Sequence, residues 1–320
     1  YQWNGSYPEP QFARIGDYAD RTRQIRLYAS TRLRPTRQLA VILGARTSRV
    51  DLRHRESYTN GTADYASRQR ESAITPYAGL VFELDGVHAL YASYTSIFEP
   101  QPLRTMAGDY LDPLQGKALE AGVKADYLDG QLQASAAVFH IRQENLAEYA
   151  GYVGDFEERY RPIAGVRSQG LELQVAGRIT PAWNVNASYT YAHIRSADGQ
   201  PVFGSQLMTT LPAHTARLFT TYRLPGAASA WKIGGGVRWQ SAFEGKVWPP
   251  SETAQDYATV RQKGYALVDL TAQFDVTPQL TLSASVRNLF DRRYDAGMGL
   301  FETAYRGEAR SALVTMHYRF

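Results

Sequence analysis

Apolar and polar residues alternate along almost the whole chain. From position 280 to 287, Leu, Leu, Ala and Val occupy every second position, and Thr, Ser and Arg fill the positions between them. The same period of two recurs in residues 119–127, 183–191, 265–274 and 312–320. A period of two places apolar side chains on one face of a β-strand and polar ones on the other, and no stretch shows a competing helical period. The pattern therefore predicts an all-β chain.

Short and long connections alternate between the predicted strands. The short ones contain Gly or Pro turn signals and lie near residues 34–36, 85–86, 129–130, 180–182, 225–226 and 277–279. The long ones cover residues 53–70, 98–115, 145–164, 196–211, 243–262 and 291–307. Long loops on one side of a meander indicate a contact surface, and outer-membrane β-barrels have this asymmetry.

The number of predicted strands indicates part of a barrel. About 13 strands follow Gln24, whereas bacterial single-chain barrels have an even number of strands and no open edge. If the complete barrel is of the 22-stranded transporter type, about nine strands precede this chain. We expect residues 1–320 to form one domain, the C-terminal portion of a transmembrane antiparallel β-barrel.

Composition excludes several classes of protein. The chain has no Cys, which excludes disulfide scaffolds and zinc ribbons, and it has no apolar stretch of about 18 residues for a transmembrane helix. A net charge of +4 is small for 320 residues and argues against a nucleic-acid partner. The basic excess is uneven, because residues 1–70 contain 13 Arg and 6 acidic residues. We interpret this excess as solvated strand ends.

Aromatic residues fall where the two interfaces of a membrane are expected. Trp183, Trp231 and Trp239 lie near strand ends, and several Tyr residues lie on apolar faces. Cross-strand pairing in a soluble sheet is the alternative, but it does not explain the alternating loop lengths. The chain ends at Phe320 after apolar residues at every second position, which resembles the signal read by the barrel-assembly machinery of Gram-negative bacteria.

Charged residues on the polar faces are expected to point into the lumen. A charge facing lipid at mid-bilayer costs about 2–4 kcal/mol, so residues such as Arg26, Glu120, Lys124 and Arg287 must face inward. There they meet either a plug or water, and both alternatives stay open.

Several blocks of sequence carry a resemblance to a known family. They are residues 91–101, 111–117, 169–173, 186–191, 265–270 and 286–294, and the Asn-Leu-Phe-Asp block at 288–291 is the most specific. In this order and spacing they resemble the C-terminal part of a TonB-dependent ferric siderophore receptor, over most of the chain. The resemblance implies a Gram-negative outer-membrane location and a plug domain with a TonB-contacting box in a preceding segment. It also implies uptake energised through TonB in the full-length parent.

No catalytic or metal-binding constellation stands out. The His residues are scattered, and the chain has no Cys nucleophile and no phosphate-binding loop before a helix. We interpret the three glycines at 234–236 as a site of sheet curvature or of close plug packing. The acidic residues at 155–158, and Asp291 with Asp295, fit solvated loop charge better than a Ca²⁺ site. We expect no catalytic residue, no resident metal and no cofactor.

The long connections instead offer aromatic and Arg side chains. A ferric siderophore already coordinates its iron, so the protein needs apolar and aromatic walls with a few donors, and no iron ligands. Arg side chains suit an anionic chelate or lipopolysaccharide phosphates. The candidate ligand contacts are Tyr149, Tyr152, Phe156, Tyr160, Phe243, Trp248, Phe301, Tyr305, Arg104 and Arg306. The alternative is that these aromatics pack on one another to hold the loops in shape.

The sequence therefore predicts an outer-membrane receptor for a ferric siderophore, in contact with outer-membrane lipid and lipopolysaccharide. A receptor of the same fold for haem, cobalamin or a carbohydrate is the first alternative. A soluble all-β binding or adhesion module, which would fold without detergent, is the second. An outer-membrane lipase or protease would need a His paired with Ser or Asp at the rim, and the sequence shows no partner for His54 or His214.

Overall fold

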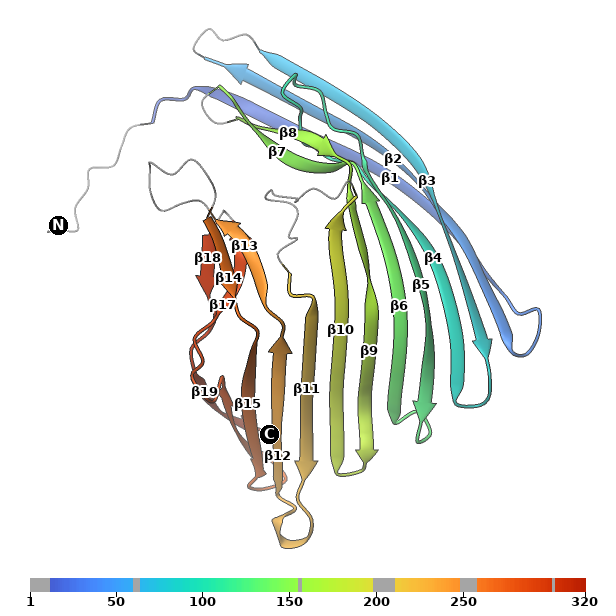
Figure 1. The fold of residues 1–320 in the computed structure, drawn as a ribbon, viewed down its shortest axis with the longest axis vertical. Coiled ribbons are helices and arrows are strands. Elements are labelled where there is room, and N and C mark those ends of the chain that lie inside the picture. The colour runs from blue at the N-terminus through green and yellow to red at the C-terminus, as the bar shows by residue number, and fades with distance from the viewer. Residues whose placement is uncertain (1–11, 60–63, 155–156, 198–210, 248–257, 301–302) are drawn as a thin grey trace, which may run out of the picture. The chain divides into compact units, whose positions relative to one another are not determined.

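The computed structural model describes residues 12–59, 64–154, 157–197, 211–247, 258–300 and 303–320. Nearly all of their regular structure is β-strand (Figure 1). The helical structure in these ranges is a single 3-10 turn, Gly226–Ala228. Within the same ranges, no helix has the length and apolar character needed to cross a membrane.

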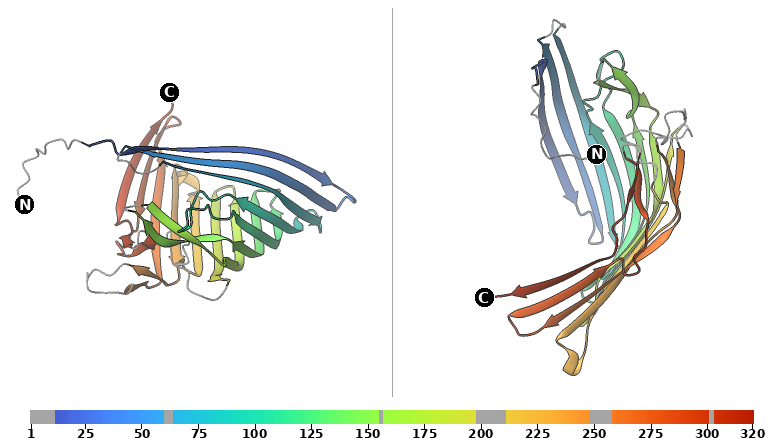
Figure 2. Two further views of the ribbon diagram at one scale, coloured as in Figure 1. Left: turned by 90° about the horizontal axis from the view of Figure 1, so that it is seen from above. Right: turned by 90° about the vertical axis from the view of Figure 1, so that its left-hand side faces the viewer.

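Thirteen strands form one sheet in which spatial order follows chain order (Figures 1 and 2). This confirms the all-β prediction and the predicted number of strands in the main sheet. The strands are β1 (Gly16–Leu33), β2 (Leu39–Tyr58), β3 (Tyr65–Glu83), β4 (His88–Glu99), β5 (Leu114–Tyr127), β6 (Leu132–Glu144), β9 (Val166–Thr180), β10 (Trp183–Ser196), β11 (His214–Arg223), β12 (Trp231–Gln240), β15 (Tyr265–Asp275), β16 (Leu280–Arg287) and β19 (Ser311–Tyr318).

Three of the long connections are hairpins. They are formed by β7 (Leu146–Val153) with β8 (Glu157–Ile163), β13 (Phe243–Val247) with β14 (Ala258–Gln262), and β17 (Asp295–Leu300) with β18 (Thr303–Arg306). The expectation of long structureless loops was wrong here, because local pairing satisfies backbone groups that a bare loop would leave to water. It was also wrong for residues 53–70, since β2 continues to Tyr58 and β3 begins at Tyr65.

The chain divides into two compact units. Unit 1 contains residues 1–28 and 46–74, and unit 2 contains residues 29–45 and 75–320. We call the strand ends at the long connections the loop side and those at the short turns the turn side. Unit 1 thus holds the loop-side residues of β1, β2 and β3. Unit 2 holds the turn-side ends of those strands together with β4 to β19.

The short connections are tight turns at the predicted places. In the turn after β3, the Asp85 carboxylate accepts the backbone N–H groups of Val87 (2.7 Å) and His88 (2.6 Å). These bonds, with a further contact to the His88 ring, lower the pKa of Asp85 to about 2. In the turn after β15, the Thr277 hydroxyl accepts the N–H groups of Gln279 and Leu280. Side chains that accept turn N–H groups end each strand sharply.

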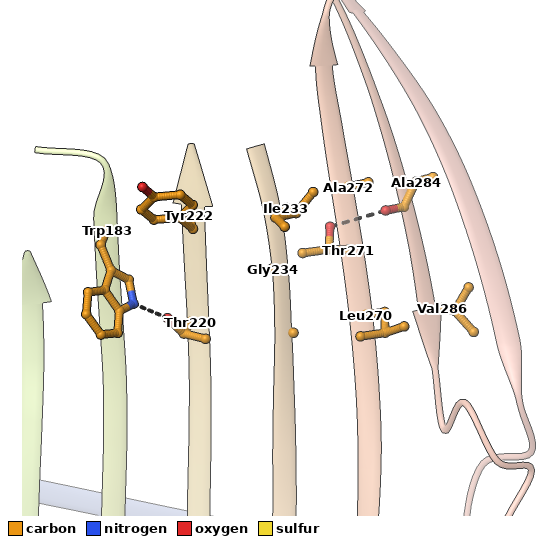
Figure 3. A pocket seen from close by; sticks show the side chains of 11 residues that line it. Trp183, Thr220, Tyr222, Ile233, Gly234, Leu270, Thr271, Ala272, Ala284 and Val286 are labelled. Atoms are coloured by element: carbon orange, nitrogen blue, oxygen red, sulfur yellow. Dashed lines mark hydrogen bonds between the residues drawn. The ribbon is translucent and has the colours of Figure 1, made fainter. Parts of the chain in front are cut away.

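In unit 2 many apolar side chains on one face of the sheet are exposed, with no cover from the described residues. Two shallow grooves of about 760 and 580 Å³ lie on it, and the larger is drawn in Figure 3. Trp183, Tyr222, Ile233 and Leu270 line the larger groove from neighbouring strands, and the Trp183 indole donates to the Thr220 hydroxyl (2.8 Å). Contiguous exposed apolar area of this extent marks contact with a membrane or a partner. It argues against the soluble alternative.

The glycines at 234–236 allow close packing within the sheet. A Cβ atom on Gly234 would lie 2.7 Å from the Thr220 carbonyl oxygen, and one on Gly236 would lie 2.9 Å from the Phe219 ring. Larger residues would therefore force β11 and β12 apart or displace Phe219. This gives the triplet a structural reason that needs no ligand.

Candidate ligand-binding site on the long connections

An aromatic cluster occupies the β7–β8 hairpin. The Tyr149 ring contacts the Tyr152 ring at a centroid distance of 5.4 Å and the Tyr160 ring at 6.2 Å, both edge to face. Tyr160 is 8% exposed and packs with Leu111 and Ala147, whereas Tyr152 is 55% exposed. Tyr160 therefore anchors the hairpin, and Tyr149 and Tyr152 present the aromatic surface.

Backbone and side-chain bonds fasten this hairpin to the connection after β4. The Tyr160 N–H donates to the Arg104 carbonyl oxygen (2.7 Å), and Arg104 bridges to Tyr110 through the backbone. The Arg104 guanidinium lies over the Tyr110 ring, 5.3 Å from its centroid. Because Arg104 is buried, it holds the hairpin and the connection after β4 together in this structure.

Two buried guanidinium groups share one carboxylate under the hairpin. Glu157 accepts Arg159 at 2.7 Å and faces Arg104 at 3.5 Å. The Nε and Nη1 groups of Arg159 are buried and find no hydrogen-bond partner in the described part of the chain. Nearby, Arg161 donates to Glu148 (2.6 Å). Each of these arginines therefore pairs with a carboxylate of the hairpin.

The other candidates divide between exposed and buried positions. Tyr305 lies over Gly297 in the β17–β18 hairpin, and Arg306 forms an exposed ion pair with Asp295 (3.0 Å). Phe243 is buried in a cluster with Tyr265, Leu267 and Tyr294. Phe156, Trp248 and Phe301 lie outside the described residues, as does part of the acidic stretch at 155–158. Tyr149, Tyr152, Tyr305 and Arg306 are the described candidates with surface to offer a ligand.

The most family-like block of the sequence forms a lock at the base of the last long connection. Asn288 is 2% exposed and has a left-handed backbone (φ +48°). Its amide donates to the carbonyl groups of Arg292 (2.9 Å) and Glu308 (3.0 Å) and accepts the Arg292 N–H (2.9 Å). The Asn288 N–H donates to the Asp269 carboxylate (2.9 Å), which also accepts a hydrogen bond from the Arg238 guanidinium. These hydrogen bonds hold the connection that follows β16 against the ends of β15 and β16.

A second lock lies at the end of β4. The buried Gln101 amide donates to the carbonyl groups of Asp112 (2.7 Å) and Asn145 (2.6 Å), and Asn145 in turn donates to Pro113 (3.0 Å). Sequence reasoning singled out both blocks as family signals without this structural role. Their signal was an Asn or Gln beside a strand end, a position where an amide can satisfy backbone groups on two segments.

The two His residues considered for catalysis both have partners, and for His54 the expectation that it has no Ser or Asp partner was wrong. His54 contacts Asp20 (2.6 Å) and Glu56, and His214 contacts the Tyr189 hydroxyl (2.8 Å) and stacks on Tyr191. Within the described ranges, no three or more His, Asp or Glu side chains gather in a way that would hold a metal ion.

Comparison with known proteins supports the β-barrel assignment. Residues 1–289 match the family described as TonB dependent receptor-like, beta-barrel. The ferric-pyoverdine 358 receptor of Pseudomonas putida is 33% identical and the ferripyoverdine receptor of Pseudomonas aeruginosa 32% identical. The matches cover 100% and 99% of this chain but 38% of each relative, so the chain spans well under half of their length.

Solved structures show the same relationship. The pyoverdine outer-membrane receptor FpvA from Pseudomonas aeruginosa PAO1, bound to pyoverdine, superposes with a TM-score of 0.82 at 31% identity. That match covers 99% of this chain and 45% of the receptor chain. The alcaligin outer-membrane receptor FauA from Bordetella pertussis gives 0.66 at 32% identity, covering 94% and 45%. This chain belongs to the β-barrel family of TonB-dependent receptors of the outer membrane.

Proposed function

We propose that this chain is the barrel portion of an outer-membrane receptor that takes up a ferric siderophore, with ferric pyoverdine as the first ligand to test. The observation that carries the proposal is the extent of the similarity. Relatives named as ferric-pyoverdine receptors match the whole of this chain, long connections included, at 31–33% identity. The uptake is non-enzymatic, and the ferric chelate is cargo rather than a cofactor.

The loop-side geometry supports a bulky chelate. Tyr149 and Tyr152 present an aromatic surface on a hairpin that Tyr160 and its apolar neighbours hold in place. Such a preformed aromatic surface binds a large, partly apolar ligand at little cost in conformational entropy. Arg306 on β18 adds an exposed guanidinium for an anionic group of the chelate.

The partners of the whole receptor form part of the proposal. A plug domain and TonB-contacting segment outside this sequence would couple ligand release to TonB, as expected for this family. The C-terminal strand β19, followed by Phe320, would be read by the barrel-assembly machinery. Lipid would cover the apolar face of unit 2.

Tyrosine replacement in the full-length receptor tests the ligand site. We expect Tyr152→Ala to weaken binding of ferric pyoverdine by about three- to tenfold, since a half-exposed aromatic contact is lost. The measurement is tryptophan fluorescence quenching in detergent, titrated with ferric and iron-free siderophores at fixed salt. Tyr222→Ala, an exposed tyrosine on the apolar face, is the matched control.

The outcomes separate the alternatives. Saturable quenching by one ferric siderophore, absent for its iron-free form, supports the proposal. No response to any ferric siderophore, with saturation by haem, cobalamin or a carbohydrate, contradicts it and leaves the barrel assignment intact. Equal affinities for Tyr152→Ala and the wild type would remove Tyr152 from the site.

A further inference from the structure

A cluster of arginines surrounds one carboxylate on the loop-side length of unit 1. Asp51 on β2 accepts the Arg53 Nε–H at 3.1 Å, the Arg68 Nε–H at 3.0 Å and the Arg70 Nε–H at 3.3 Å, and Arg68 adds a second bond through Nη2. The Arg side chains are substantially exposed, whereas Asp51 is mostly covered by them. Three guanidinium groups on one carboxylate leave net positive charge at the surface.

Further arginines lie on the same face. His54 on β2 contacts Asp20 on β1, so these residues share the opposite face of the sheet. Because side chains alternate along a strand, the odd-numbered positions of β1 and β2 share the face of Asp51, as do the even-numbered positions of β3 that bond to it. We name this surface the arginine face; its members are Arg21, Arg23, Arg49, Arg53, Arg55, Arg68 and Arg70.

Exposed apolar residues border the arginine face on its turn side. Ile25 and Leu27 follow Arg23 at alternate positions of β1, and Ile74 follows Arg70 at an alternate position of β3. All three have exposed side chains. On both strands the same face thus changes from basic to apolar as the chain runs from the loop end toward the short turn. A boundary of this kind marks the place where a membrane-facing surface leaves the hydrocarbon.

The side of the membrane follows from the connections. Outer-membrane barrels place short turns in the periplasm and long connections outside the cell. The turn between β1 and β2 is short, and the arginine face lies at the far end of these strands. It therefore lies at the level of the outer-leaflet head groups, facing the membrane and not the lumen.

We propose that the arginine face binds the phosphate groups of lipopolysaccharide in the outer leaflet. Guanidinium groups bind phosphate oxygens through paired N–H donors, and Asp51 holds three of them side by side. The acyl chains of the same lipid would lie along Ile25, Leu27 and Ile74. A free anion would use only the guanidinium groups, whereas this lipid uses both parts of the surface. The inference rests on the barrel family and is independent of the siderophore.

A paired set of variants tests the proposal in the full-length receptor. Arg53→Gln with Arg70→Gln removes two of the guanidinium groups, and Arg26→Gln with Arg287→Gln removes two exposed ones at positions assigned to the opposite face. Binding of purified lipopolysaccharide to the delipidated receptor is measured in detergent by native mass spectrometry and as a function of salt. We expect the first pair to lose on the order of tenfold in affinity with a weaker salt dependence, and the second pair to behave as the wild type.

Two further readouts keep the test decisive. Siderophore affinity and the heat-induced mobility shift of the folded barrel should be unchanged in both pairs, which separates lost contacts from misfolding. Lipopolysaccharide stripped of its phosphates should bind the wild type as weakly as the intact lipid binds the first pair. Equal losses in both pairs, unchanged binding after phosphate removal, or displacement of the lipid by equimolar inorganic phosphate would each overturn the proposal.

Discussion

Two surfaces of this chain that we propose to face the membrane differ in the chemistry of their side chains. The groove around Tyr222, Ile233 and Leu270 in unit 2 is mainly apolar, whereas the arginine face of unit 1 is basic beside exposed Ile and Leu side chains. Both arise from the same alternation along a strand. In our proposal, the chemistry at each second position follows its depth in the membrane, apolar in the hydrocarbon and cationic at the head groups.

The loop-side connections of unit 2 follow a different principle. Their buried residues form small clusters, such as Leu111, Ala147 and Tyr160, and their backbone groups are closed by Asn288 and Gln101. Protein contacts among the described residues hold these parts in place. The outward face, in contrast, exposes apolar side chains, which we propose that lipid covers.

The largest expected effect comes from placing a charge on the apolar face. Ala284→Arg, which enters the larger groove, should cost about 2–4 kcal/mol and reduce assembly into the membrane. Ser285→Arg, the next residue on β16, points to the other face and should be much milder. Heat-modifiable mobility after refolding into lipid vesicles measures both, and equal losses would contradict the assignment of faces.

The pair Val268 and Asp269 looks equivalent in sequence but is a poorer choice. Asp269 accepts both the Asn288 N–H and Arg238, so replacing it would also open the lock at the last connection. Replacing Asp269 would therefore lower the stability of the protein for a reason unrelated to lipid.

An intermediate effect is expected at the Asn288 lock. Asn288→Ala removes three hydrogen bonds. It also places Ala at a positive φ, which Ala tolerates less well than Asn. Together these changes should lower the free energy of unfolding by about 1–3 kcal/mol. Asn288→Gly keeps the backbone conformation accessible and isolates the contribution of the bonds. Urea unfolding in micelles is the measurement, and wild-type midpoints for both variants would show that the lock contributes nothing.

The smallest effect concerns the turn after β3. Because the pKa of Asp85 falls from 3.8 to about 2 on folding, its contribution is present above about pH 4 and disappears as the pH falls toward 2. Asp85→Asn should therefore be slightly less stable than the wild type at pH 7, and the difference should vanish near pH 2. Urea midpoints across this range test the sign, and a difference that grows on acidification would contradict it.

Much of the fold was predictable because strand periodicity and turn chemistry are local. The Asp85 and Thr277 turns lie where their residues indicated, and the 13 strands of the main sheet match the expected number. The hairpins within the long connections were missed. Their strands are short, such as Phe243–Val247 and Thr303–Arg306, and too few residues alternate to give a signal.

The candidate site was predictable only as a set of residue types. Sequence could place Tyr149, Tyr152 and Tyr160 in one connection but could not tell that Tyr160 is buried and Tyr152 exposed. The early arginines were interpreted as solvated strand ends, because a count of charges does not show which of them share a face.

By itself the sequence determined the all-β class, the order of strands and turns, and the residues on the apolar face of each strand, since each follows from a period of two and from neighbouring residues. Only the tertiary structure decided which loop aromatics anchor the connections, that Asn288 and Gln101 close them, and that Asp51 collects arginines from two strands. These features join residues that are distant in sequence. Register and packing place such residues together, and no local pattern encodes that placement.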